Sequence, residues 1–180
     1  MDPRVEKRIG IKSLFDKVVS PQEAAALIED GSVVGMSGFT RAGDAKVVPM
    51  ALVERAKAAP FKIDVYTGAS LGPEVDKYLA EAGAIRKRGP FQADSGTRNL
   101  VNSGQMTYVD AHLSHNAELV RQGIIGPIKH AIIEAVAITE DGMIIPTTSV
   151  GNSNIFVEYA ENVIVELNIS HPESLIGIHD

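Results

Sequence analysis

The most informative segment of the sequence is Val33-Val34-Gly35-Met36-Ser37-Gly38-Phe39. It is a short apolar, β-branched run in which two glycines lie on either side of a serine, with an aromatic residue directly after. Glycine allows the backbone to turn sharply and lets another molecule approach the main chain closely. Because open α/β sheets bind ligands at the carboxyl ends of their strands, we predict a buried strand that ends in a ligand-binding loop.

The sequence around this stretch alternates between helix and strand signals. Ser20-Pro21-Gln22-Glu23 is a helix start, because the serine can cap the helix, proline is tolerated at its first position and Glu23 completes a capping box. This helix is expected to continue through Ile28 and to stop at Gly31. Further helices are expected at residues 47–58, 74–82, 94–103, 117–122 and 154–160, and strands at residues 32–36, 62–67, 130–139, 143–145 and 162–167.

The order of these elements predicts an α/β fold, with a mainly parallel sheet and helices on both of its faces. Residues 32–36 and 162–167 are expected to be buried strands. Glu140-Asp141-Gly142 is a hairpin signal, so residues 143–145 should pair back on the preceding strand. The chain has 180 residues and no internal repeat or linker, and we therefore expect one domain.

Composition excludes several classes of protein. The net charge of −6 argues against nonspecific nucleic-acid binding, which needs a basic surface. The absence of cysteine excludes disulfides and thiol nucleophiles. No apolar run approaches the ~20 residues that cross a bilayer, and the charged residues 1–8 are not followed by the apolar core of a secretory signal. We expect a cytoplasmic protein that binds neither nucleic acid nor membrane.

Three loops with the same chemistry follow expected strands. They are Ser37-Gly38-Phe39, Gly68-Ala69-Ser70 and Ser149-Val150-Gly151-Asn152-Ser153. In a parallel sheet all three would lie on one edge, where small side chains leave room for a ligand and backbone N–H groups can bind an oxyanion or carboxylate. The alternative is that glycine and serine simply make tight turns there.

The sequence gives weaker evidence for other kinds of site. Gly35-Met36-Ser37-Gly38 is not the Gly-x-Gly-x-x-Gly of dinucleotide sites, no Gly-Lys-Ser/Thr phosphate loop is present, and Ser37 lacks the frame of a nucleophile elbow. A metal site at His112 and His115 would have Asp110 as its one obvious further ligand, so a loop or interface role is favoured and no metal is expected.

Two charged features have competing interpretations. Glu134 lies within an apolar strand, where a solvent-facing or hydrogen-bonded structural role is favoured over catalysis. Arg86-Lys87-Arg88 is a basic cluster for which a solvated face is favoured over a phosphate contact.

Taken together, the residues resemble the N-terminal part of the acetyl-CoA hydrolase/transferase family, which includes class I succinyl-CoA:acetate CoA-transferases. The resemblance covers nearly the whole chain. It is carried by the segments 33–40, 67–70, 137–142, 148–153 and 177–180.

The resemblance implies a class I CoA-transferase fold and covalent chemistry through a glutamate. The substrates would be an acyl-CoA and a small carboxylate, with coenzyme A as substrate and no other cofactor, and the full-length protein would be a homodimer. In this family the nucleophilic glutamate lies in the C-terminal half. The resemblance therefore implies no catalytic residue in this chain, and we do not assign that role to Glu134. The isolated chain should be inactive, and its coding sequence should continue past Asp180.

The same resemblance implies a set of substrate-binding residues. Ser70 matches a serine at the acyl end of the site, and the first loop matches a glycine-rich loop near it. The full set is Ser37, Gly38, Phe39, Gly68, Ser70, Gly151 and Asn152. Asp44 and Ala93 depart from the family pattern, and these departures bear on the choice of acceptor acid.

Residues 1–180 are thus expected to form the N-terminal domain of an acetyl-CoA hydrolase or CoA-transferase, with the catalytic domain outside the chain. One alternative is a non-catalytic association subunit of a two-chain CoA-transferase, to which a partner chain brings the glutamate. A nucleotide-dependent oxidoreductase is the third and weakest alternative.

Overall fold

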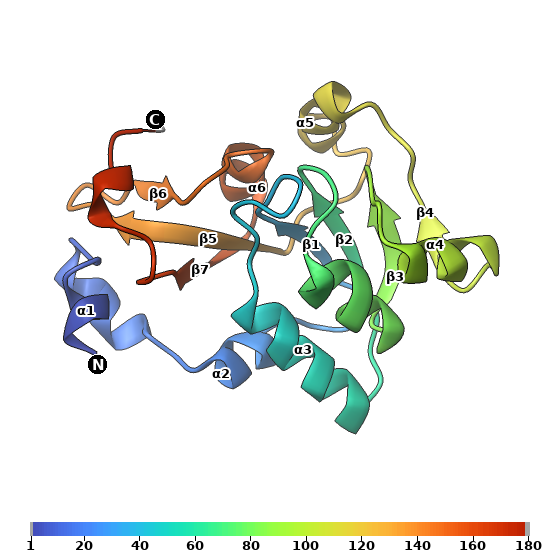
Figure 1. The fold of residues 1–180 in the computed structure, drawn as a ribbon, viewed down its shortest axis with the longest axis horizontal. Coiled ribbons are helices and arrows are strands. Elements are labelled where there is room, and N and C mark those ends of the chain that lie inside the picture. Colours follow the sequence, from blue (N-terminus) through green and yellow to red (C-terminus); the bar gives the residue numbers. More distant parts are fainter. Residues whose placement is uncertain (1, 179–180) are drawn as a thin grey trace.

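A seven-stranded sheet forms the centre of the computed structural model, which describes residues 2–178 (Figure 1). The strand order is β4-β3-β2-β1-β5-β6, and β7 also pairs with β5. The pair β5–β6 is antiparallel, and every other strand pair of the described chain is parallel. The predicted mainly parallel sheet is therefore confirmed. The strands are β1 Val33–Met36, β2 Ile63–Thr67, β3 Ile85–Gly89, β4 Thr107–Tyr108, β5 His130–Ile138, β6 Ile144–Pro146 and β7 Asn162–Leu167.

Helices cover both faces of this sheet. One face packs against α2, α3 and the π-helical segment η2, and the other packs against α5 and α6 (Figure 1). The helical elements are α1 Pro3–Glu6, η1 Lys12–Lys17, α2 Pro21–Ala26, α3 Val47–Ala58, η2 Glu74–Leu79, α4 Ser95–Asn102, α5 Leu113–Arg121, α6 Ser153–Tyr159 and η3 Glu173–Leu175. The expected arrangement of helices on both faces is confirmed.

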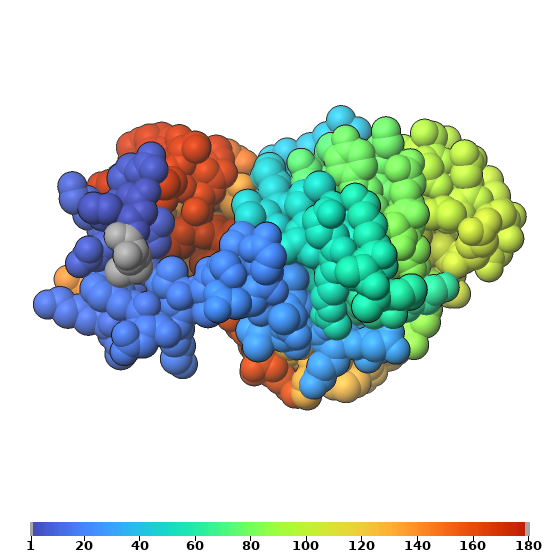
Figure 2. Space-filling model, turned by 90° about the horizontal axis from the view of Figure 1, so that it is seen from below, coloured from blue at the N-terminus to red at the C-terminus, as the bar shows by residue number. Residues whose placement is uncertain are grey.

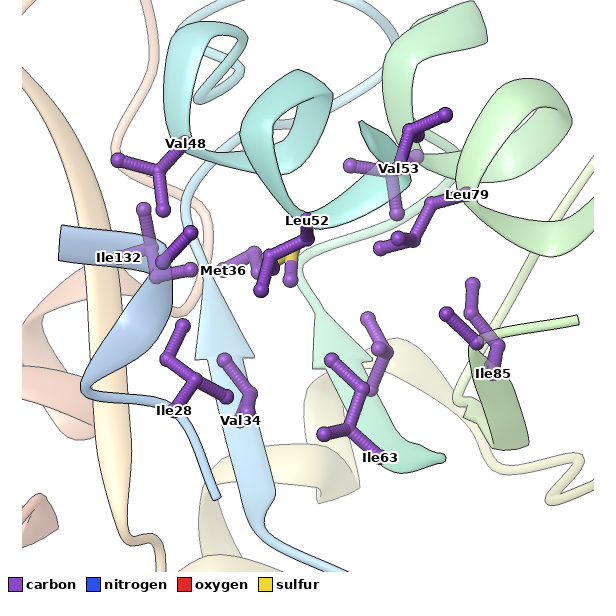
Figure 3. Close-up of a cluster of buried hydrophobic side chains, with 14 of the residues drawn as sticks. Ile28, Val34, Met36, Val48, Leu52, Val53, Ile63, Leu79, Ile85 and Ile132 are labelled. Atoms are coloured by element: carbon purple, nitrogen blue, oxygen red, sulfur yellow. The ribbon is translucent and has the colours of Figure 1, made fainter. Parts of the chain in front are cut away.

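The residues of β1 face two different hydrophobic cores, one on each side of the sheet. Val34 and Met36 point to one face of β1, where they join Leu52 of α3 in the larger cluster (Figure 3). Gly35 points to the other face, where the ring of Phe156 from α6 fills the space that a side chain would need. A Cβ on Gly35 would lie 2.5 Å from Cγ of Phe156. Because side chains alternate between the two faces of a strand, β1 packs against the helices on both sides of the sheet.

Local sequence signals located several elements correctly. Helix α3 has the predicted bounds, Val47–Ala58. The capping box before α2 is formed in full, because the Glu23 N–H donates to Ser20 Oγ at 3.2 Å and the Ser20 N–H donates to Glu23 Oε2 at 2.8 Å. The predicted hairpin after β5 is also present, with β6 as its second strand.

The prediction of a solvated face for the basic cluster Arg86-Lys87-Arg88 is correct for Arg86, which is exposed, and wrong for Arg88, whose side chain is completely buried. These residues form the middle of β3. The segment lacks the apolar alternation that marks a strand, because its charges are matched by Asp64 and Asp76 from neighbouring elements. The pairing partner of β3, the short strand β4, was also not predicted.

Strand β7 was expected to be buried, and this expectation is wrong as well. Within the described residues β7 pairs only with β5, so its other edge carries unpaired backbone groups. Its residues are half-buried or exposed, and the Val163 side chain is 39% exposed. An apolar strand composition does not distinguish an edge strand from an inner one.

Strand β5 is longer than its neighbour β1 and extends beyond it. Residues 130–132 of β5 pair with β1, whereas residues 135–138 pair with the antiparallel β6. On the opposite side of β5, Ile9 bridges to Ile138. The Arg8 guanidinium donates to the carbonyl of His171 at 2.8 Å, so the first and last described segments lie side by side at this end of the molecule (Figure 2).

Candidate functional site

The three small-residue loops meet at the carboxyl edge of the sheet, as predicted. A Cβ on Gly68 would lie 2.7 Å from the Gly38 carbonyl oxygen and 3.2 Å from Cα of Gly151. One glycine from each loop is therefore packed against the other two. The space beside these glycines is filled by the neighbouring loops, so their small size serves loop packing and not an open volume for a ligand.

The third loop reaches this edge from the second strand of the predicted hairpin, because β6 runs antiparallel to β5. Because β5 extends past β1, β6 returns the chain toward the end of β1. There Ser149 Oγ donates to the Ala42 carbonyl at 2.6 Å, and Asn152 Nδ2 donates to the Thr67 carbonyl at 3.2 Å. The third loop is thus bonded to both of the others.

In the first loop, the Ser37 side chain is buried within the fold. Its hydroxyl donates to the Gly43 carbonyl at 2.7 Å and accepts the Glu134 N–H at 2.8 Å. The hydroxyl therefore donates one hydrogen bond and accepts one, both with backbone groups of the fold. Gly38, with φ of 121°, takes a conformation that L residues rarely adopt and lies against Leu71.

The tip of the first loop is a tight turn that presents Phe39. The backbone groups of Phe39 and Ala42 bond to each other at 2.9 and 3.1 Å, and Thr40 and Arg41 between them have positive φ values of 50° and 69°. Phe39 is 40% exposed. This turn places an accessible aromatic ring beside the glycine contacts.

The second loop is held by buried charges. Arg88 Nε donates to Asp76 Oδ1 at 2.8 Å, Arg88 Nη1 donates to Thr67 Oγ1 at 2.8 Å, and Arg88 Nη2 donates to the Ala69 carbonyl at 3.1 Å. Asp76 Oδ2 in turn accepts the Leu71 N–H at 2.6 Å. These contacts fix the backbone on both sides of Ser70.

Ser70 itself differs from its neighbours. Within residues 2–178, neither its backbone N–H nor its hydroxyl has a hydrogen-bond partner, and the residue is partly exposed. Of the two candidate serines, Ser37 is thus used inside the fold, while Ser70 retains two hydrogen-bonding groups at the surface of the edge.

Asp44 connects the first loop to the second. Its Oδ2 accepts the Gly72 N–H at 2.5 Å, while its Oδ1 is buried and has no hydrogen-bond partner among the described residues. Burial raises the pKa of the Asp44 carboxyl above its ordinary value, and the Gly72 N–H and the nearby Lys46 oppose this shift.

Glu134 has the hydrogen-bonded structural role that we favoured for it. The carboxylate is buried, Oε1 accepts from Lys46 Nζ at 3.0 Å and from Asn168 Nδ2 at 2.8 Å, and Oε2 accepts from the Thr147 hydroxyl. Both oxygens of this carboxylate are therefore occupied by hydrogen bonds inside the fold.

A second glutamate, Glu166, was not singled out in the sequence. Its carboxylate accepts the N–H groups of Lys46, Val47 and Val48 at 2.8, 3.0 and 2.7 Å, at the start of α3. Burial raises the pKa of Glu166, and these three N–H groups oppose the shift. The edge strand β7 thereby caps the helix that follows the first loop.

No metal site emerges from the part of the chain that the structure describes, where no three His, Cys, Asp or Glu side chains are grouped to hold an ion. His112 and His115 lie with ring centroids 5.4 Å apart, and His112 Nδ1 contacts Ser114 Oγ at 2.7 Å. None of the described helices combines the length and the apolar character that a membrane crossing requires.

Two solved structures share the fold of this chain. RipA from Yersinia pestis superposes with a TM-score of 0.69 at 20% identity, over 96% of this chain and 40% of RipA. Glutaconate coenzyme A-transferase from Acidaminococcus fermentans gives a TM-score of 0.63 at 14% identity, over 83% of this chain and 68% of that chain. At these identities the likeness concerns the fold, which is the α/β fold of CoA-transferases.

Sequence comparison narrows the class to a family. Residues 3–180 match the model of the acetyl-CoA hydrolase/transferase N-terminal domain, and the chain belongs to this family. Succinyl-CoA:acetate CoA-transferase of Clostridium kluyveri is 46% identical over 177 residues, which are 97% of this chain and 33% of the relative. Acetyl-CoA hydrolase of Saccharomyces cerevisiae is 34% identical, over 98% of this chain and 35% of the relative. The chain spans about a third of the length of the curated relatives it matches.

The family resemblance inferred from sequence motifs is therefore confirmed. Four of the five motif segments lie wholly within the described residues. The fifth ends with His179 and Asp180, which lie outside them.

Proposed function

We propose that this chain forms the acyl-binding wall of an acetyl-CoA hydrolase or acyl-CoA:carboxylate CoA-transferase, and that the reactive glutamate lies outside the chain. The proposal is supported by relatives of both kinds, at 46% and 34% identity. It is also supported by the two carboxylates that might have served as nucleophile, because Glu134 and Glu166 are both bonded within the fold.

The observation that carries the proposal is the contrast between Ser70 and the groups around it. Its N–H and hydroxyl are unbonded within residues 2–178, while the adjacent Ala69 carbonyl and Leu71 N–H are both occupied. Fixed donors at the place where charge develops stabilise acyl-transfer intermediates, because they need no reorganisation during the reaction. Ser70 would donate to the acyl or carboxylate oxygen of the substrate, and the accessible Phe39 ring would contact its apolar part.

The reaction would proceed by two exchanges on the external glutamate. Its carboxylate attacks the acyl carbon of the thioester, CoA thiolate leaves, and a mixed anhydride remains. The thiolate then attacks the glutamyl carbonyl, which gives a glutamyl-CoA thioester and releases the first carboxylate. An acceptor carboxylate reverses these steps, whereas water gives hydrolysis. Division into two covalent stages replaces one difficult exchange by easier ones.

A chimera tests this function. Residues 1–180 would replace the matching N-terminal third of the Clostridium kluyveri relative, and CoA transfer from succinyl-CoA to acetate would be measured. We expect turnover by the chimera, no turnover by the isolated chain, and a loss of about 10- to 100-fold in kcat/KM for Ser70→Ala. Ser13→Ala, an exposed serine in η1, serves as the matched control. A folded chimera without activity, or an active one indifferent to Ser70→Ala, would refute the proposal.

The exposed edge of β7 favours a second candidate, an association subunit that a catalytic partner chain completes. Unpaired strand edges are sites where another chain can add. Native mass spectrometry of this chain with the separately expressed remainder of the Clostridium kluyveri relative distinguishes the two. A stable one-to-one complex with activity supports the subunit, and activity only in the fused chimera excludes it.

A further inference from the structure

Arg88 is the largest completely buried side chain among the described residues, and it carries a charge. A buried ion pair is weak support for stability, since desolvation of the two charges offsets much of their attraction. Replacement of such a pair by apolar side chains of similar volume is often neutral. The presence of Arg88 in the interior therefore requires an explanation other than stability.

The contacts of Arg88 identify what it holds. Its partners are Thr67 Oγ1, the Ala69 and Gly89 carbonyls, and both oxygens of Asp76. Apart from the Gly89 carbonyl on its own strand, every partner belongs to the end of β2, to the second loop or to η2, which follows the loop. The planar guanidinium supplies these donors in a fixed fork that a lysine could not reproduce.

Asp76 extends the same contacts to the other side of Ser70. Its Oδ2 accepts the Leu71 N–H, and its backbone carbonyl accepts the Thr97 hydroxyl of α4. The backbone is thus bonded immediately before Ser70, at the Ala69 carbonyl, and immediately after it, at the Leu71 N–H. The loop has no regular secondary structure that would otherwise fix it.

We propose that Arg88 and Asp76 are positioning residues for Ser70, and that they hold its N–H and hydroxyl in the orientation that binds an acyl oxygen. The inference rests on the proposed function in one respect, the contact between Ser70 and the acyl group. A donor displaced by about 1 Å can lower a catalytic rate by about a hundredfold, so the rigidity of this loop is itself functional.

The test uses the chimera of residues 1–180 with the remainder of the Clostridium kluyveri relative, and the paired variant R88M/D76L, which removes both charges together and leaves neither one buried alone. Amide hydrogen exchange by NMR measures the loop, and a titration with acetyl-CoA monitors the Ser70 amide. We expect unchanged protection in β1 and β2, exchange at Leu71 faster by about tenfold or more, and acetyl-CoA affinity at Ser70 weaker by about tenfold.

Two further variants complete the design. R86M changes an arginine on the same strand that bonds to Asp64 and not to the loop, and it should leave Leu71 exchange and acetyl-CoA affinity unchanged. If R88M/D76L does not fold, the near-isosteric Thr67→Val removes one acceptor of Arg88 and tests the same loop.

The outcomes separate the two ideas. If R88M/D76L folds and its Leu71 amide exchanges at the wild-type rate, the positioning role is overturned, whatever the affinity for acetyl-CoA. A loosened loop with unchanged affinity at Ser70 overturns it as well. A wild-type Ser70 amide that does not respond to acetyl-CoA refutes the proposed function and, with it, the reason for holding the loop.

Discussion

The loops after β1 and β2 have nearly the same composition and opposite uses of their serines. In the first loop, the Ser37 hydroxyl is bonded to two backbone groups and the surface is left to Phe39. In the second loop, buried charged side chains bond the backbone and the Ser70 hydroxyl remains without a partner within residues 2–178. A serine in a glycine-containing loop therefore indicates a turn, and only the hydrogen-bond partners of the serine decide between a structural and a binding role.

This difference follows from what lies beneath each loop. β1 lies beside the long strand β5, whose Glu134 N–H is available at the point where β1 ends. β2 lies beside β3, which contributes the Arg88 side chain. The neighbouring strand thus determines which group holds each loop. It is a backbone N–H of β5 for the first loop and the Arg88 side chain of β3 for the second.

The largest expected effect concerns the glycine contact that both loops share. Gly68→Ala places a methyl group 2.7 Å from the Gly38 carbonyl oxygen, so the backbones must separate. We expect a loss of about 3 kcal/mol in the free energy of unfolding, measured by urea denaturation. Gly31→Ala is the control, because its Cβ meets nothing within 4 Å and only its positive φ of 80° is unfavourable. Equal losses in the two variants would show that the loops do not depend on this close contact.

The contrast between the serines predicts a smaller effect. Ser37→Ala leaves the Glu134 N–H and the Gly43 carbonyl buried without their partner, at a loss of about 2 kcal/mol in the free energy of unfolding. Ser70→Ala should change the free energy of unfolding by less than about 0.5 kcal/mol, since no hydrogen bond within the described chain is broken. Denaturation of both variants under identical conditions checks this pair. A reversed order would contradict the assignment of roles to the two loops.

The smallest effect is a pH dependence at Asp44, which joins the loops. Its pKa is raised in the folded protein, so ionisation above the ordinary value of 3.8 lowers stability as the pH rises through the folded value. Asp44→Asn keeps an acceptor for the Gly72 N–H and has no charge. The stability of this variant relative to wild type should therefore increase as the pH rises from about 4 to about 8. If the stability difference between Asp44→Asn and wild type stays constant or decreases over this pH range, the pKa of Asp44 is not raised in the folded protein.

Elements with local signals could be predicted from the sequence. The capping box at Ser20, the bounds of α3 and the turn before β6 depend on residues within a few positions of one another. The meeting of the first two loops also followed from the parallel sheet, whereas the third loop reaches the same edge from the antiparallel strand β6. β3 could not be predicted, because its charges are matched by Asp64 and Asp76, 22 and 12 positions away.

The roles of the candidate residues depended on still longer distances. The acceptor role of Ser37 involves an N–H 97 residues further along the chain, and Glu166 caps α3 across about 120 residues. No pattern near Ser37, Ser70 or Glu166 distinguishes them from other serines and glutamates. The residue types at the edge were therefore predictable, whereas their partners were not.

The extension of β5 past β1 gives the first residues of the chain an influence on the distant edge. The backbone of Arg8 and Gly10 bonds to both groups of Ile138, at 2.7 Å each, and Ile138 also pairs with Ile144 of β6. Strand β6 leads directly into the loop that contains Gly151. Removal of the segment before Ile11 would thus leave both backbone groups of Ile138 without these partners, on the strand that holds β6 in front of the third loop.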